Sequence, residues 1–103
     1  TADEIVQMID AVKSKNLRAC PDTGTFPGNV YAELEKLAPL AVHMHAKTYA
    51  FNEKGDETRL NYRRIFRIFK DAGFEGTYSL EYEGEGEESE GVERSLALFR
   101  RYI

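Results

Sequence analysis

This chain of 103 residues contains a single cysteine and no long run of apolar residues. Because Cys20 has no partner for a disulfide within the chain, the sequence fits a reducing compartment, and we expect a cytoplasmic protein. A membrane-spanning helix needs about 20 consecutive apolar residues, which no segment approaches, so we expect no membrane partner. No secretory signal opens the sequence.

A concentrated basic segment is also missing, and the formal net charge is −4. The densest basic stretch, residues 59–70, is interleaved with apolar residues at helical spacing. This pattern predicts the exposed face of a helix rather than a phosphate-binding surface. Because binding to nucleic acid requires a basic surface, we expect no nucleic-acid partner.

The overall composition is that of an ordinary globular chain, with 42% hydrophobic and 31% charged residues. Its length suits one domain over residues 1–103, with a small core. Apolar residues recur at helical spacing in four segments, and three short apolar runs lie between them. We expect helices over residues 1–16, 30–37, 61–72 and 92–103, strands over residues 17–20, 40–47 and 76–82, and exposed loops over residues 51–59 and 83–91.

Strands that alternate with helices in this way form parallel sheets through crossover connections, so the sequence predicts an α/β fold. About three parallel strands alternate with four helices. A closed (β/α)8 barrel needs about 250 residues, and the outer strands of an open sheet expose unpaired backbone groups. We therefore expect the chain to sit in a larger protein or to self-associate.

Polar side chains lie where the apolar run of each predicted strand gives way to polar residues, toward the strand ends at which parallel α/β proteins gather their functional groups. These residues are Asp22, His45 and Glu81. Two carboxylates and one imidazole are a plausible ligand set for a divalent cation such as Mn²⁺, Mg²⁺, Co²⁺ or Zn²⁺. The pattern leaves other interpretations open: Asp22 also fits an Asx-turn, and a single His near a strand is often structural.

The second predicted strand carries two further polar residues, Lys47 and His43, each two positions from His45. Lys47 follows His45 by two residues, so both side chains point to the same side if the strand continues that far. Lys47 is a candidate to contact a substrate oxygen or a developing negative charge, and a solvated surface lysine is the alternative. We interpret His43 as structural, because it lies deeper along the strand.

Residues 20–26, 43–47 and 79–84 resemble the motifs of the xylose-isomerase-like superfamily of TIM barrels, in the order and spacing of that family. Residues 71–76 are similar to its linker into the final strand. The resemblance implies a partial (β/α)8 TIM barrel, with residues 1–103 as its C-terminal portion. It also implies that Asp22, His45 and Glu81 bind a divalent metal ion, with a fourth ligand, a Glu, one strand earlier.

Two departures limit what the resemblance implies about substrate contacts. Some epimerases of the superfamily carry a His just after the aspartate motif, where this chain has residues 24–26, and an Arg where it has Phe51. The substrate contacts of those epimerases are therefore not carried over to this chain.

The resemblance implies a metal-dependent isomerase or epimerase that acts on a sugar, sugar phosphate or polyol. Glu81 and the missing Glu would transfer a proton next to a carbonyl, through an enediolate, and we expect the isolated chain to be inactive. Two alternatives remain: a metal-dependent dehydratase, which is a lyase, or a non-catalytic folded module that serves assembly. Fold-level resemblance alone does not decide between them.

Overall fold

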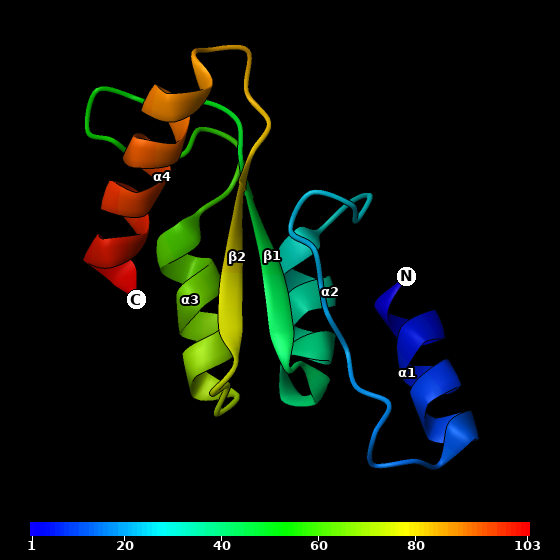
Figure 1. Cartoon of the computed structure of the whole chain (residues 1–103). Coiled ribbons are helices and arrows are strands. Elements are labelled where there is room, and N and C mark those ends of the chain that lie inside the picture. The colour runs from blue at the N-terminus through cyan, green and yellow to red at the C-terminus, as the bar shows by residue number, and fades with distance from the viewer.

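The computed structural model describes residues 1–103 and shows helices alternating with two parallel strands (Figure 1). This arrangement is an α/β fold consistent with part of a TIM barrel, which confirms the predicted fold class. None of the helices combines the length and the apolar composition that crossing a bilayer requires. The elements, in order, are α1 (Ala2–Val12), α2 (Val30–Leu37), a 3-10 helix η1 (Ala38–Leu40), β1 (His43–Thr48), α3 (Tyr62–Asp71), β2 (Thr77–Tyr82) and α4 (Glu88–Tyr102).

Each α-helix begins at a residue whose side chain caps its first turn. Thr1 and Glu4 form the predicted capping box of α1, in which each satisfies a backbone N–H group of the other. Asn29 caps α2 and Asn61 caps α3 through their side-chain oxygens. The starts of these three helices therefore follow from local hydrogen-bonding chemistry.

The sheet has one ladder, in which His43 of β1 lies opposite Thr77 of β2 and Thr48 lies opposite Tyr82. Alternate residues of β1 point to opposite faces. Met44, Ala46 and Thr48 are buried, whereas the residues between them are partly exposed. One face of the sheet is therefore apolar, and the other carries polar side chains.

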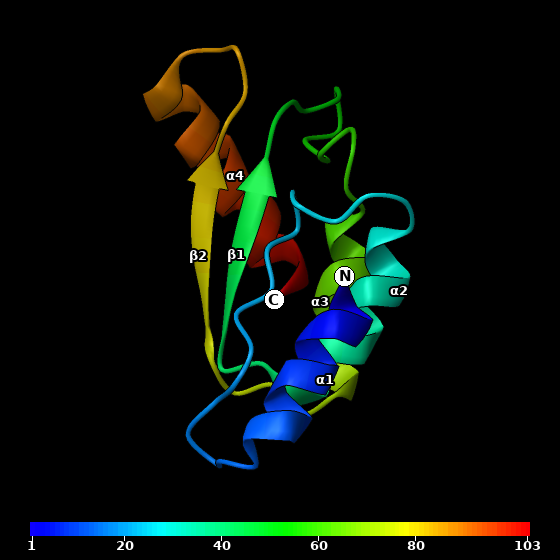
Figure 2. The same cartoon turned by 90° about the vertical axis from the view of Figure 1, so that its right-hand side faces the viewer.

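The main core lies between the apolar face and the helices. Figure 2 shows α2 and α3 together on one side of the two strands. Aromatic rings fill this space: Tyr62, Phe66 and Phe99 pack with ring centroids 4.8 to 5.3 Å apart. Such geometry adds to the apolar area that each ring removes from water. The core therefore fixes the helices on one face and leaves the polar face open.

The first predicted strand, residues 17–20, is not a regular strand. The segment pairs with the chain around β1 only through two parallel bridges, Ala19 with Ala41 and Asp22 with His45. Pro21 lies between these bridges and lacks the N–H group that a continuous ladder would use there. The pairing is interrupted at Pro21 and resumes one residue out of register, which brings Asp22 beside His45.

Two predicted helix boundaries were wrong, for local reasons. Helix α1 ends at Val12 rather than near Asn16, because Lys13 adopts a left-handed conformation with φ 54°. Helix α4 begins at Glu88, inside the stretch that we expected to be a loop. The Glu87 carboxylate accepts from the N–H groups of Ser89 and Glu90, which lowers its pKa, and acidic residues are favoured in a first turn.

The loop after β1 is also less exposed than predicted, because Glu57 is only 7% exposed. Its carboxylate accepts hydrogen bonds from four backbone N–H groups, those of Tyr49, Ala50, Arg59 and Leu60. A buried carboxylate requires such partners. The Glu57 carboxylate therefore holds the two ends of this loop together through hydrogen bonds to the backbone.

Candidate metal centre

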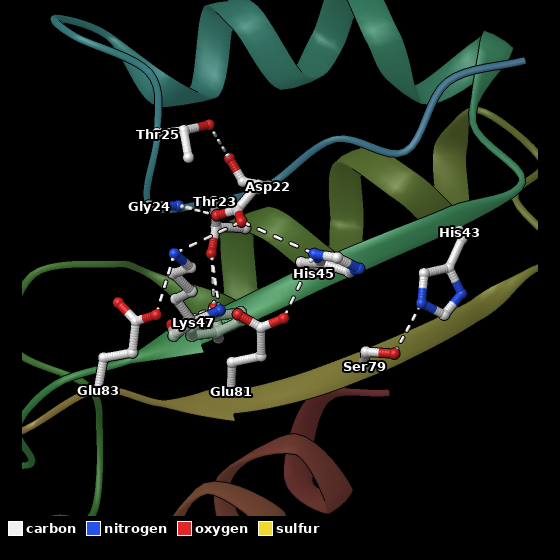
Figure 3. A network of polar contacts seen from close by, with 11 residues as sticks. Asp22, Thr23, Gly24, Thr25, His43, His45, Lys47, Ser79, Glu81 and Glu83 are labelled. Carbon is white, nitrogen blue, oxygen red and sulfur yellow. Dashed lines mark hydrogen bonds and ion pairs between the residues drawn. The ribbon is translucent and has the colours of Figure 1, made fainter.

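The three residues that the sequence singled out meet on the polar face of the sheet, between its middle and its C-terminal end (Figure 3). Asp22 comes from the segment that pairs with β1, His45 from β1 itself and Glu81 from β2. One ligand atom from each lies within 4.8 Å of the others. Segments far apart in the sequence thus place two carboxylates around one imidazole.

The Nδ1 atom of His45 faces both carboxylates. It lies 3.3 Å from Oε1 of Glu81 and 3.8 Å from Oδ2 of Asp22. The side chains of His45 and Glu81 are 39% and 37% exposed, whereas that of Asp22 is 18% exposed. The three groups therefore converge on a point that solvent or a ligand reaches from the open face.

The two oxygens of the Asp22 carboxylate have different partners. Oδ1 accepts a hydrogen bond of 2.8 Å from the N–H group of Gly24, which is the Asx-turn anticipated from the sequence. Oδ2 faces His45 and Lys47. The turn and the candidate ligand role therefore coexist, and the turn orients the carboxylate toward the cluster.

Lys47 is not a solvated surface lysine, since its side chain is only 15% exposed. Its Nζ atom lies 3.2 Å from Oε1 of Glu83 and 3.6 Å from Oδ2 of Asp22. The hydrogen bond to Glu83 and the charge of Asp22 raise the pKa of Lys47 above its ordinary value. Lys47 therefore presents a positive charge beside the cluster and is not a base at neutral pH.

Glu83 belongs to this site, because its carboxylate contacts Lys47, although its acidic surroundings in the sequence predicted an exposed loop. Its N–H group donates to the carbonyl of Thr48, so the pairing with β1 continues one residue past β2. The signal for its role was its spacing, because a residue two positions after Glu81 projects to the same face of an extended chain.

His43 lies deeper on the same face and is held by β2, as its structural interpretation implied. Its Nδ1 and Nε2 atoms lie 2.6 Å from the hydroxyl of Thr77 and 2.7 Å from that of Ser79. Donor atoms of Cys20, His43 and His45 also lie within 4.8 Å of one another. Both ring nitrogens of His43 are already hydrogen-bonded, and burial raises the pKa of the Cys20 thiol, so this second group is the poorer ligand set.

The chemistry of the first group fits a divalent cation. Two carboxylates and one imidazole supply hard oxygen donors and one nitrogen, a set suited to Mn²⁺, Mg²⁺, Co²⁺ or Zn²⁺. Three protein ligands also leave coordination positions for substrate or water. Asp22, His45 and Glu81 are thus the residues that would hold such an ion.

Comparison with known proteins agrees with this fold. A family model described as "Xylose isomerase-like TIM barrel" matches residues 1–102, so the chain belongs to the xylose isomerase-like TIM barrel family. A curated relative, the C-glycoside deglycosidase alpha subunit of Arthrobacter globiformis, is 34% identical to it over 74 residues. That alignment covers 65% of this chain and 21% of the relative, so the match spans about a fifth of that protein.

Proposed function

We propose that the protein carrying this chain is a divalent-metal-dependent isomerase or epimerase that acts on a sugar, sugar phosphate or polyol. The observation that carries the proposal is the convergence of Asp22, His45 and Glu81 within 4.8 Å on the open polar face. Family membership supports it, because the segments that carry these three residues resemble the metal-binding motifs of that superfamily.

In the proposed reaction, Glu81 transfers the proton and Lys47 stabilises charge. The Glu81 carboxylate takes a proton from the carbon next to a substrate carbonyl, and the electron pair of that C–H bond moves onto the carbonyl oxygen. The Lys47 ammonium would stabilise the negative charge that develops there. In isomerisation, the proton returns to the former carbonyl carbon, while the hydroxyl proton on the deprotonated carbon passes to the former carbonyl oxygen and leaves a new carbonyl behind. In epimerisation, a proton returns to the opposite face of the same carbon and the original carbonyl forms again.

A divalent cation bound by Asp22, His45 and Glu81 would supply Lewis acidity that polarises the carbonyl group. The chain's own residues would keep the substrate in place for the proton transfer. The Glu81 side chain is 37% exposed, so a substrate on the open face reaches its carboxylate. A second carboxylate from another part of the barrel would complete the proton exchange.

A lyase is the second candidate, because elimination begins with removal of the same proton as isomerisation. Removal of the same proton leads to elimination when the neighbouring carbon carries a leaving group, since the electron pair then expels that group. A dehydratase would lose hydroxide, which leaves as water after protonation. The residues proposed here serve both outcomes, and analysis of the products distinguishes them.

A non-catalytic module is the third candidate. Two strands and one interrupted segment leave the outer edge of β2 without a neighbouring strand. The rest of a barrel or a second copy of the chain would cover that edge. A protein of this kind would keep its fold and association after substitution of Glu81 and would show no turnover.

The proposal is tested by titrating the full-length protein with Mn²⁺ in a calorimeter. We expect Asp22→Asn, His45→Ala and Glu81→Gln each to lower the affinity for Mn²⁺ at least tenfold, and Glu81→Gln also to abolish turnover of sugars. Glu75→Gln is the matched control, because it removes an exposed carboxylate away from the cluster.

Two outcomes would contradict the proposal. If the unmodified protein does not bind Mn²⁺, Mg²⁺, Co²⁺ or Zn²⁺, the assignment of the metal centre is wrong. If Glu81→Gln retains full turnover, Glu81 does not transfer the proton.

A further inference from the structure

Two buried hydroxyl groups bind both backbone groups of Lys47. The Lys47 N–H group donates to Oγ1 of Thr23 at 2.9 Å, and the Tyr62 hydroxyl donates to the Lys47 carbonyl oxygen. The two hydroxyl oxygens lie 3.0 Å apart. Thr23 is 3% exposed and Tyr62 is 2% exposed, so water does not compete for these bonds.

The direction of each hydrogen bond in this cluster follows from the number of hydrogens available. The Tyr62 hydroxyl has one hydrogen, which it donates to the Lys47 carbonyl. The Thr23 hydroxyl must then donate to the Tyr62 oxygen, while it accepts from the Lys47 N–H group. Burial raises the pKa of Tyr62 above its ordinary value, so Tyr62 remains a donor. Every group in the cluster is satisfied in one arrangement only.

The cluster lies where the backbone pairing of β1 with the preceding segment ends. The last bridge joins Asp22 to His45, and beyond it the chain turns away at Gly24. The N–H and carbonyl groups of Lys47 have no backbone partner on this side of β1. The hydroxyl groups of Thr23 and Tyr62 take the place of such a partner. Figure 3 shows Thr23 between the strand and the Asp22 turn.

We propose that Thr23 and Tyr62 are positioning residues for the metal centre. Neither hydroxyl touches the donor atoms of Asp22, His45 or Glu81. They act through the backbone, by holding the Asp22 turn against the end of β1 and so keeping Asp22 and Lys47 in place. This inference rests on the proposed function for its link to metal binding, whereas the positioning itself is measurable without metal.

The test uses Tyr62→Phe and Thr23→Val in the full-length protein. Phenylalanine keeps the ring that packs against Phe66 and Phe99, and valine keeps the shape of threonine. Thr23→Ser retains the hydroxyl and is the conservative rescue. Tyr78→Phe is the matched control, since it removes a tyrosine hydroxyl near the start of β2, away from the cluster.

Three quantities are measured for each variant: the affinity for Mn²⁺, the hydrogen-exchange rates of the Lys47 and Gly24 amides, and the midpoint of unfolding. We expect Tyr62→Phe and Thr23→Val to lower the Mn²⁺ affinity 10- to 100-fold, as loss of groups that orient ligands does. The two amides should exchange at least tenfold faster, while amides in the middle of α3 change less. Thr23→Ser and Tyr78→Phe should stay within a few-fold of the unmodified protein.

A lower midpoint of unfolding with unchanged Mn²⁺ affinity and unchanged exchange at Lys47 and Gly24 would overturn the inference, because the hydroxyls would then be structural only. If the unmodified protein binds no Mn²⁺, the proposed function fails, and the exchange rates still decide the positioning role. Unchanged exchange in both variants would refute it in that case as well.

Discussion

At the scale of single residues, side chains that appear alike in the sequence have different roles because of their neighbours. Glu57 and Glu53 lie in the same loop, yet Glu57 is buried against four backbone N–H groups and Glu53 is exposed. Glu83 likewise looks like its neighbours in an acidic run, but it pairs with Lys47. Burial and hydrogen-bond or ion-pair partners therefore decide which of these carboxylates contribute to the structure and the candidate site.

Glu57→Ala should destabilise the protein by about 3 kcal/mol, because it leaves four backbone donors without their acceptor in a buried loop. Urea unfolding of both proteins measures the difference. Glu53→Ala, in the same loop, should change the free energy of unfolding by less than about 0.5 kcal/mol. Equal effects of the two substitutions would show that the Glu57 hydrogen bonds do not organise the loop.

Lys47→Gln should separate catalysis from metal binding. Removing the ammonium group, 3.6 Å from Oδ2 of Asp22, removes a charge that repels a bound cation, so the affinity for Mn²⁺ should stay the same or rise. Turnover should fall about 10²-fold if Lys47 stabilises the developing negative charge. Calorimetry and steady-state kinetics report the two effects, with Lys54→Gln as an exposed control. Undiminished turnover would exclude Lys47 from the chemistry.

At the scale of elements, helix α4 is held to β2 by the fit of a glycine against a tyrosine. A methyl group on Gly91 would overlap the ring of Tyr82, and the Tyr82 hydroxyl accepts from the N–H group of Gly86. Glycine inside a helix ordinarily costs stability relative to alanine. It is favoured here because the helix and the strand approach closely at this position.

Gly91→Ala should therefore destabilise the protein, by about 1 to 3 kcal/mol, although the same change stabilises most helices. Thermal unfolding of the variant measures this. The double variant Gly91→Ala with Tyr82→Leu should regain part of the loss, because the smaller side chain makes room for the methyl group. A stabilised single variant would show that α4 and β2 do not pack this closely.

At the scale of the whole molecule, the chain is more extended than a closed domain of its size. Its radius of gyration is 14.2 Å and its extents are 45 × 24 × 21 Å. A compact domain of 100 residues has a radius of gyration of about 13 Å. Helix α1 accounts for part of this, because it packs on α2 and lies away from the sheet in both overall views (Figures 1 and 2).

Stability should fall when the pH rises above about 10, because buried phenols and a paired lysine must then lose protons. Burial raises the folded-state pKa of Tyr62, Tyr49 and Tyr78, and Glu83 raises that of Lys47. A raised pKa contributes stability that is fully present below the unfolded-state pKa. That contribution is lost as the pH rises through the folded-state pKa.

Free energies of unfolding measured between pH 8 and pH 11.5 test whether stability falls as the pH rises. We expect a decline above about pH 10, and a shallower one for Tyr62→Phe, which has one fewer buried phenol. A stability that rises with pH over this range would contradict the burial of these groups.

Much of the fold was predictable because its signals are local. Thr1 with Glu4, Asn29 and Asn61 mark helix starts through hydrogen bonds to residues two or three positions away. The apolar runs at the start of β1 and within β2 were recognised for the same reason, and their parallel arrangement follows from the helix between them. Asp22, His45 and Glu81 stood out because each lies where the apolar part of a predicted strand gives way to polar residues.

The sequence by itself determined the four α-helices, the two paired strands, most helix starts and the three residues that meet in the candidate metal centre, since each depends on neighbours a few positions away. Only the tertiary structure decided the interruption at Pro21, the pairing of Lys47 with Glu83 and the contact of Thr23 with Tyr62. These contacts join residues far apart in the chain, and their geometry depends on strand register and core packing, for which no local pattern exists.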